Sequence, residues 1–196
     1  MVNQEKIEEI RNYAQENNIP IMMDDGISYL EKYIKENNIK KILEIGTAIA
    51  YSTIKMCEVS DDIFITTIEK DNTRYLQALK NIEDFNLNNR INLIYGDASE
   101  IELKDKYDFI FIDAAKAQNK KFFLKFEKNL KEDGVIITDN MNFHGLAEKN
   151  LEDIESKNLR QLVRKIQDYN LFLKENKKYK TEFLNIGDGL AISKRI

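Results

Sequence analysis

Three oxygen-bearing side chains follow two apolar segments in the second half of the chain. Asp113 closes the apolar run 107–112, and Asp139 and Asn140 close the run 134–138. Carboxylate and amide oxygens are hard ligands, so this set suits Mg²⁺ or a similar divalent cation that keeps water or substrate oxygens in its other positions. The alternative is that each residue caps a helix or forms a turn, and Asp139-Asn140 are the strongest case for it.

Histidine and cysteine are too scarce for a zinc site. His144 and Cys57 are the single residues of these types, whereas zinc sites use three or four such ligands. We interpret His144 as a loop residue that could touch a substrate, and Cys57 as a small core residue. One cysteine excludes an internal disulfide, which fits a reducing cytosol.

A second chemical region begins at the stretch 41–52, KILEIGTAIAYS. An apolar strand ends in a turn at Gly46, and a helix starts near Ala50, which is the usual entry to a nucleotide-type cofactor pocket. Glu44 interrupts the strand, and because a buried carboxylate needs a partner we expect it to face a ligand or a helix N-terminus. The second glycine of G-x-G-x-x-G is missing, which argues against a nicotinamide cofactor and favours S-adenosylmethionine (SAM).

Acids also end the next two strands. Glu69 closes the β-branched run 62–69, about 20 residues after the glycine turn, where dinucleotide folds grip the ribose hydroxyls. The alternative is that Glu69 simply begins a polar loop. Asp97 follows the strand 91–95 and could cap a helix, contact the cofactor, or do both.

Strands and helices alternate in five repeats, which predicts a Rossmann-like, doubly wound parallel α/β sheet. Strands are predicted over 41–45, 62–69, 91–95, 107–113 and 134–138, and helices over 4–17, 26–37, 72–86, 119–130 and 158–175. In helix 72–86 we expect an inward face made of Tyr75, Leu76, Leu79, Ile82 and Phe85. A hairpin around Gly187-Asp188-Gly189 closes the chain with an antiparallel strand. Ligands bind outside the carboxyl ends of such strands, where the acids lie.

The composition is that of an ordinary globular chain. It has 196 residues, of which 42% are hydrophobic and 33% charged, and a net charge of −4. We predict one domain, 1–196, with an N-terminal helical cap (1–38) and a Rossmann-like core (39–196). The net charge gives no global attraction to nucleic acid or membrane, although a local basic patch is compatible with it. A polar N-terminus and the lack of a long apolar run predict a cytoplasmic protein without a membrane span.

Five motifs carry a resemblance to a known family. LEIGTAIAYS, TIEKD, YGDA, FIDAAK and ITDNMNFHG, in this order and spacing, resemble the cation-dependent class I SAM O-methyltransferases, which include catechol and caffeoyl-CoA O-methyltransferases. The resemblance covers nearly the whole chain. It implies a single methyltransferase domain whose seven-stranded sheet is mainly parallel with an antiparallel last strand, preceded by N-terminal helices.

The resemblance also implies roles at matching positions. The implied cofactor-binding residues are Met22, Glu44, Gly46, Tyr51, Ser52, Glu69, Asp97, Ala98 and Asp113. The implied metal ligands are Asp113, Asp139 and Asn140, and the implied catalytic residues are Asp113 and Lys116, the latter as general base beside the substrate hydroxyl. From their own context, Met22 and Met23 either pack in the core or line the mouth of a cofactor pocket.

Two further stretches narrow the resemblance. NNIPIMMDDGISYL and NLRQLVRKIQDYN…TEFLNIGDGLAISKR are similar to the bacterial tRNA 5-hydroxyuridine methyltransferases, which make 5-methoxyuridine at the wobble position. The chain departs from the wider family at Ala50, where glycine is usual. It also departs at Ala114-Ala115, where catechol enzymes carry bulkier side chains; smaller ones are consistent with a wider substrate mouth.

A wobble-uridine methyltransferase would have the tRNA anticodon region as its partner. Mg²⁺ held by two neighbouring substrate oxygens would lower the pKa of the hydroxyl, and Lys116 would take or guide its proton. Candidate phosphate contacts are Lys157, Arg160, Arg164 and Lys165; the alternative is a solvated helix face.

Two other functions compete with this interpretation. A small-molecule O-methyltransferase acting on catechol-like diols would use the same site. Glu182 lies where catechol enzymes carry a substrate-side carboxylate, which is a weak point for this function. A catalytically idle cofactor-binding protein is the third option, and the acid, amide and lysine set argues against it. The apolar face of helix 4–17 would allow a homodimer.

Overall fold

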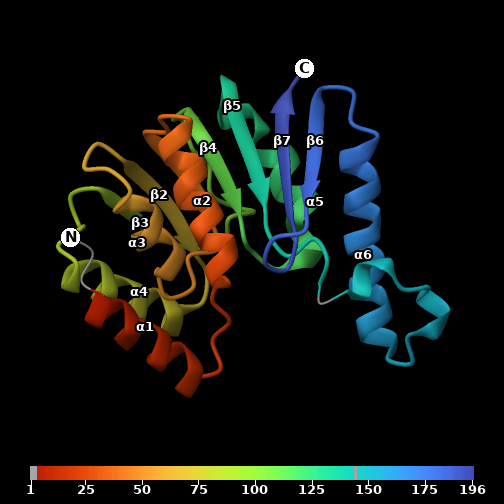
Figure 1. Cartoon of the computed structure of the whole chain (residues 1–196), viewed down its shortest axis with the longest axis horizontal. Helices are drawn as coiled ribbons and strands as arrows, with labels where there is room; N and C mark the ends of the chain where they lie inside the picture. The colour runs from red at the N-terminus through yellow and green to blue at the C-terminus, as the bar shows by residue number, and fades with distance from the viewer. Residues whose placement is uncertain (1–3, 144) are drawn as a thin grey trace. The chain divides into compact units, whose positions relative to one another are not determined.

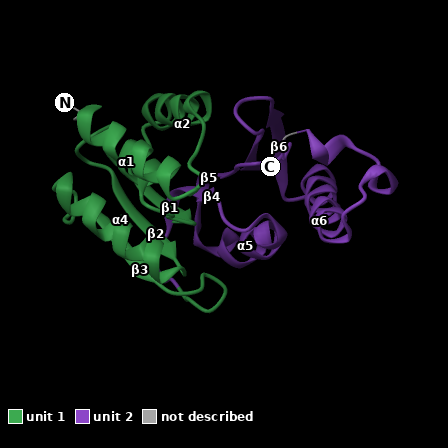
Figure 2. Ribbon diagram, turned by 90° about the horizontal axis from the view of Figure 1, so that it is seen from below, with its two compact units in different colours: residues 1–102 green, residues 103–196 purple. Residues whose placement is uncertain are grey.

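The computed structural model describes residues 4–143 and 145–196 (Figure 1). His144, which we interpreted as a loop residue, lies outside the described residues. The chain divides into two compact units, residues 1–102 and 103–196 (Figure 2). The predicted helical cap, 1–38, belongs to the first unit.

From residue 4 onward, the first unit is a parallel three-stranded sheet with four helices. Its elements are α1 (Gln4–Glu16), α2 (Asp24–Glu36), β1 (Lys41–Ile45), α3 (Tyr51–Cys57), β2 (Phe64–Glu69), α4 (Asn72–Asp84) and β3 (Ile91–Tyr95). The strand order is β3-β2-β1, and Ile45 pairs with Ile68. β1 and β3 both run parallel to β2. The β-branched side chains of β1 and β2 are buried, as expected for a sheet covered on both faces.

Within its described residues, the second unit contains four strands and two α-helices. Its main elements are β4 (Tyr107–Ile112), α5 (Asn119–Phe126), β5 (Leu130–Thr138), α6 (Lys157–Lys174), β6 (Tyr179–Leu184) and β7 (Leu190–Arg195). Short 3₁₀ turns are η1 (Lys116–Gln118), η2 (Glu127–Asn129), η3 (Leu146–Glu148) and η4 (Leu151–Asp153). The order is β4-β5-β7-β6; β4 and β5 are parallel, and β7 is antiparallel to both neighbours.

With seven strands, mainly parallel and with an antiparallel last strand, the predicted Rossmann-like α/β fold is confirmed. The closing hairpin is also found where the Gly-Asp-Gly turn predicts it. Among the described residues, no helix combines the length and apolar character that crossing a membrane requires.

The prediction for the buried face of α4 is wrong in part. Ile82 is buried as expected and Tyr75 and Phe85 are half-buried, but Leu76 and Leu79 are 54% and 37% exposed. The inward side chains are instead Ala78, Asn81 and Ile82. Asn81 reaches the core because its Nδ2 donates to the backbone oxygen of Ile49 at 2.7 Å, so a hydrogen bond rather than apolar area sets this face.

Candidate functional site

The turn after β1 is a run of backbone in unusual conformation. Gly46, Ala48 and Ala50 have φ values of 100°, 49° and 66°, a region that only glycine enters without cost. The backbone nitrogens of Gly46 and Thr47 both donate to Ile68 O, at 3.1 and 3.3 Å. This turn leads directly into α3, so the strand, turn and helix expected of a cofactor pocket are all present.

Glu44 lies in the interior of the first unit, with 0% of its surface exposed. Its carboxylate accepts hydrogen bonds from Ser52 Oγ and Thr67 Oγ1, both at 2.6 Å, and from Thr53 Oγ1. Ser52 and Thr53 are in the first turn of α3, so Glu44 faces a helix N-terminus, one of the two environments we expected. Hydrogen bonds from these three hydroxyls to one carboxylate hold β1, β2 and α3 together. A direct role of Glu44 in cofactor binding stays a prediction.

Glu69 is fixed by the backbone at the end of β2. One carboxylate oxygen accepts from Ala48 N and the other from Asp71 N, each at 2.8 Å. The residue is buried, with 7% of its surface exposed, rather than the start of a solvated loop. Each oxygen keeps a lone pair for a further donor, which is what a ribose hydroxyl would require.

Asp97 begins a turn and not a helix. Its Oδ1 accepts from Ser99 N at 2.7 Å, its backbone oxygen accepts from Glu100 N at 2.9 Å, and residues 98–106 form no helix. The helix-cap alternative is therefore wrong for Asp97, while its cofactor contact stays a prediction. Ala98 beside it is buried.

An arginine that the sequence did not single out joins α1 to this region. Arg11 Nη2 donates to Tyr51 Oη at 2.6 Å, and its guanidinium lies 5.3 Å from the centre of that ring. Both Nη atoms also donate to the Asp24 carboxylate, which holds the pKa of Asp24 below its usual value. Met22, two residues before Asp24, is buried against Gly26. Arg11 thus links Tyr51 to the start of α2, two residues after Met22.

In the second unit, Asp113, Asp139 and Asn140 form one group, which we call the carboxylate cluster. Ile112 and Thr138 are paired in the parallel strands β4 and β5, so the residues after them lie side by side. Asn140 Nδ2 donates to Asp113 Oδ1 at 3.1 Å and to Asp139 Oδ2 at 3.2 Å, and Asn140 N donates to Asp139 Oδ1 at 2.7 Å. The predicted ligand set therefore converges.

The charges of this cluster are poorly compensated by the protein. Burial raises the pKa of Asp113 to about 6, although Lys116 and Asn140 oppose the shift. Burial, and then repulsion from Asp113 and Asp188, raise the pKa of Asp139 to about 7. Two carboxylates held together away from water require a cation or a proton.

The donor set of the carboxylate cluster fits a hard divalent ion. Within residues 4–143 and 145–196, no group of three or more His, Cys, Asp or Glu side chains is arranged to hold a metal. The cluster instead offers two carboxylates and, once the Asn140 amide turns its Oδ1 towards them in place of Nδ2, one amide oxygen. Mg²⁺ is commonly held by one or two carboxylates with water or substrate completing its shell. A cation would also offset the repulsion between Asp113 and Asp139.

Lys116 lies next to the carboxylate cluster at the start of η1. Its Nζ is 5.0 Å from the centre of the Phe143 ring, and its charge lowers the pKa of both Asp113 and Asp139. The sequence places it three residues after Asp113, and its ammonium group is near enough to both carboxylates for its charge to act on them. This position is compatible with the predicted general base.

The four cations predicted to contact tRNA differ in their surroundings. Lys157, Arg164 and Lys165 are exposed on or at the start of α6. Arg160 is half-buried, and its Nε and Nη2 donate to Ile154 O at 3.0 and 2.6 Å. Its guanidinium therefore holds the segment before α6 in place.

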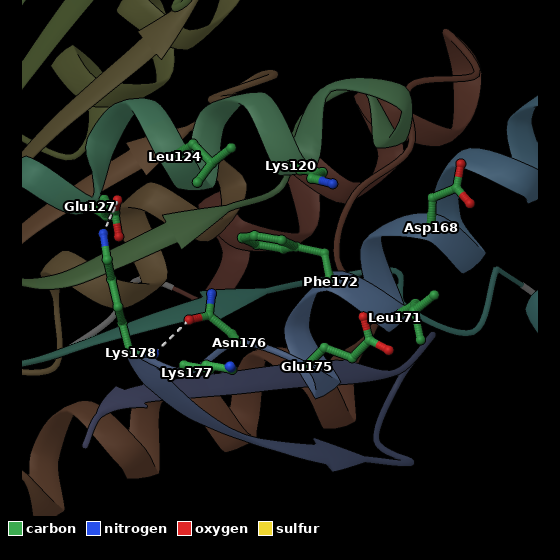
Figure 3. A pocket seen from close by; sticks show the side chains of 10 residues that line it. All are labelled: Lys120, Leu124, Glu127, Asp168, Leu171, Phe172, Glu175, Asn176, Lys177 and Lys178. Atoms are coloured by element: carbon green, nitrogen blue, oxygen red, sulfur yellow. Dashed lines mark hydrogen bonds and ion pairs between the residues drawn. The ribbon is translucent and has the colours of Figure 1, made fainter.

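A cavity of about 600 Å³ lies elsewhere in the second unit, beside α5, α6 and the turn after α6 (Figure 3). It contains none of the predicted site residues. Lys120 Nζ lies 4.9 Å from the centre of the Phe172 ring, and Lys178 Nζ is 3.5 Å from a carboxylate oxygen of Glu127. Because these charges are directed at neighbouring side chains, we assign no site to the cavity.

Comparison with known proteins gives consistent matches over nearly the full length. Residues 2–196 match the family model described as O-methyltransferase. The structure of a putative caffeoyl-CoA O-methyltransferase from Staphylococcus aureus is 44% identical, with a TM-score of 0.92 over 97% of this chain and 92% of that one. An O-methyltransferase from Bacillus cereus in complex with SAH is 27% identical, with a TM-score of 0.83 over 98% and 91%. A caffeoyl-CoA O-methyltransferase from Populus kitakamiensis is 28% identical over 205 residues, 98% of this chain and 87% of that protein.

Proposed function

The chain belongs to the O-methyltransferase family, and from that premise we propose that it methylates the 5-hydroxyl of 5-hydroxyuridine at the tRNA wobble position. SAM is the methyl donor of this class, and a relative of known structure is in complex with SAH. We further propose Mg²⁺ or a similar cation as the second cofactor. The carboxylate cluster carries the proposal for the reaction, because it needs a cation and lies beside Lys116.

The chain's own residues would divide the work between them. Asp113, Asp139 and Asn140 would hold the cation, which when bound lowers the pKa of a coordinated hydroxyl and fixes its direction. Lys116 would accept or guide the hydroxyl proton. Glu69 would bind the ribose hydroxyls of SAM with the lone pairs that Ala48 N and Asp71 N leave open. Alignment of this kind can contribute about 7–11 kcal/mol to catalysis.

Sequence resemblance and surface charge support tRNA as the acceptor. The first and last stretches of the chain resemble the bacterial tRNA 5-hydroxyuridine methyltransferases, and Lys157, Arg164 and Lys165 are exposed cations. Because Arg160 is bonded to Ile154 O, we assign the phosphate contacts to the other three. The competing acceptor is a small catechol-like diol, which is favoured by the names of relatives that act on caffeoyl-CoA.

Nucleoside mass spectrometry of tRNA from cells that lack the protein tests the acceptor. We expect 5-methoxyuridine to disappear and 5-hydroxyuridine to accumulate, and both changes should reverse when the gene is restored. An unchanged nucleoside profile, together with methyl transfer by the purified protein to a catechol, would replace tRNA by the small-molecule acceptor.

Charge reversal tests the tRNA surface separately. Arg164→Glu combined with Lys165→Glu should weaken tRNA binding by about tenfold or more at low salt. The variant should also show a weaker dependence of tRNA affinity on salt, because fewer phosphate contacts mean that fewer counterions are released on binding. SAH affinity should not change. Lys80→Glu combined with Lys104→Glu, at two exposed lysines outside this surface, changes the net charge by the same amount and is the control. Equal tRNA affinity in wild type and the double variant would remove this surface from the proposal.

A further inference from the structure

We propose that the β6–β7 turn, residues 185–189, positions Asn140 and thereby sets the cation affinity of the carboxylate cluster. This inference rests on the metal site of the proposed function. The turn contains the Gly-Asp-Gly signal that the sequence assigned only to hairpin formation. In the structure its backbone reaches the segment that follows Asn140.

Two successive backbone hydrogen bonds join the turn to that segment. Met141 N donates to Gly189 O at 3.0 Å, and Asn142 N donates to Asp188 O at 2.8 Å. A side-chain bond, from Asn142 Nδ2 to Asn185 Oδ1 at 2.9 Å, adds a third link. The antiparallel pairing of β5 with β7 ends at Thr138 and Ala191, so these links continue the contact past the cluster residues.

Asn140 needs this support because of its backbone conformation. Its φ is 63°, a left-handed value that asparagine tolerates better than most residues but that still requires restraint from its surroundings. The chain is held before Asn140, where Asp139 N donates to Ile112 O at 3.1 Å, and after it, where Met141 N donates to Gly189 O. Fixed on both sides, the Asn140 amide stays directed at Asp113 and Asp139.

Gly189 allows the turn to come this close. Its φ is 88°, and a Cβ at this position would lie 2.9 Å from Asn142 N and 2.8 Å from Asn142 Cγ. Real Cβ atoms do not approach so near, so any larger residue must push Asn142 away. Because metal ligands must be held within about 0.5 Å of their working geometry, displacement of residues 140–142 should be felt first in cation binding.

The test measures Mn²⁺ affinity by electron paramagnetic resonance and SAH affinity by calorimetry on the same full-length proteins. Gly189→Ala should weaken Mn²⁺ binding by at least about tenfold, the range seen for groups that orient metal ligands. Gly145→Ala is the matched control, because Gly145 also has a left-handed φ of 76° but no atom lies within 4 Å of the added Cβ. It should change Mn²⁺ affinity by less than about twofold.

A milder variant covers the case in which Gly189→Ala fails to fold. Asn185 is exposed, so Asn185→Ala should fold normally and, by losing the bond to Asn142, weaken Mn²⁺ binding by roughly threefold. SAH affinity should be unchanged in every folded variant, because the predicted SAM residues other than Asp113 lie in residues 1–102. A selective loss of Mn²⁺ affinity is a result that general destabilisation would not give.

Wild-type behaviour separates the two proposals. If wild type binds Mn²⁺ and the turn variants bind it equally well, the positioning role is overturned and the metal site stands. If wild type does not bind Mn²⁺, the proposed metal site is overturned, and the positioning role with it. If the variants lose SAH affinity as much as Mn²⁺ affinity, the turn supports the fold and has no specific role at the cluster.

Discussion

Glu44 and the two aspartates of the carboxylate cluster are all buried acids of a Rossmann-like sheet, but they differ in the number of hydrogen-bond donors that surround them. Glu44 has three hydroxyl donors directed at one carboxylate. Asp113 and Asp139 share the side-chain amide of one asparagine, and the pKa values of both are raised well above the usual range for aspartate. A carboxylate with sufficient donors stabilises the fold, whereas a pair with too few is prepared for a ligand.

The largest effect is expected from Asp113→Ala. Loss of one of two carboxylates should reduce methyl transfer by at least about 100-fold and weaken cation binding in parallel. Because Asp113 is also an implied cofactor-binding residue, circular dichroism rather than SAH affinity reports on whether the fold is intact. Methyl transfer is measured with labelled SAM, with and without EDTA. A variant that keeps near-normal, EDTA-resistant turnover would contradict the metal assignment.

Glu44→Gln should give the largest loss of stability. The amide oxygen can replace only part of the acceptor capacity of the carboxylate, and its NH₂ group faces hydroxyls that now donate to Glu44. We expect the free energy of unfolding to fall by about 3 kcal/mol, equally in Mg²⁺ and in EDTA. Denaturant unfolding followed by circular dichroism measures it. A Mg²⁺-dependent loss would show that Glu44 and the cluster are not independent.

Asp139→Asn should raise the stability of the protein when divalent cations are absent. Replacing one of two buried like charges by a neutral isostere removes the repulsion from Asp113 and Asp188. In EDTA the variant should be more stable than wild type by about 1 kcal/mol. In saturating Mg²⁺ the order should reverse, because wild type alone gains binding energy. Thermal melts at pH 8 under both conditions make the comparison; a variant less stable in EDTA would refute it.

The smallest effect is expected at Ala50, where this chain departs from the family's usual glycine. With φ at 66°, alanine is strained, while glycine costs more entropy on folding. Ala50→Gly should therefore change stability by no more than about 1 kcal/mol, in the stabilising direction, with SAH affinity retained. Chemical denaturation measures the change. A loss above that size would mean that the Ala50 methyl group packs usefully.

Sequence patterns could predict the elements and the acids at their ends, because these depend on neighbours close in the chain. Parallel strands place successive carboxyl ends at one edge, so the convergence of Asp113 with Asp139 followed from the βα repeat alone. Periodicity failed at α4, where two leucines are exposed and Asn81 is buried. No local sequence pattern predicts a long-range hydrogen bond such as the one from Asn81 Nδ2 to Ile49 O.

The amino-acid sequence by itself determined the fold class, the family motifs and which acids meet. The tertiary structure decided which long-range contacts form. These are the hydrogen bonds of hydroxyls to Glu44, the Arg11 link between Asp24 and Tyr51, and the close contact of Gly189 with Asn142. Arg11 and Tyr51 are 40 positions apart. Partners so distant in the chain are brought together by packing, and only packing determines whether a buried carboxylate is satisfied within the protein or left to bind a cation.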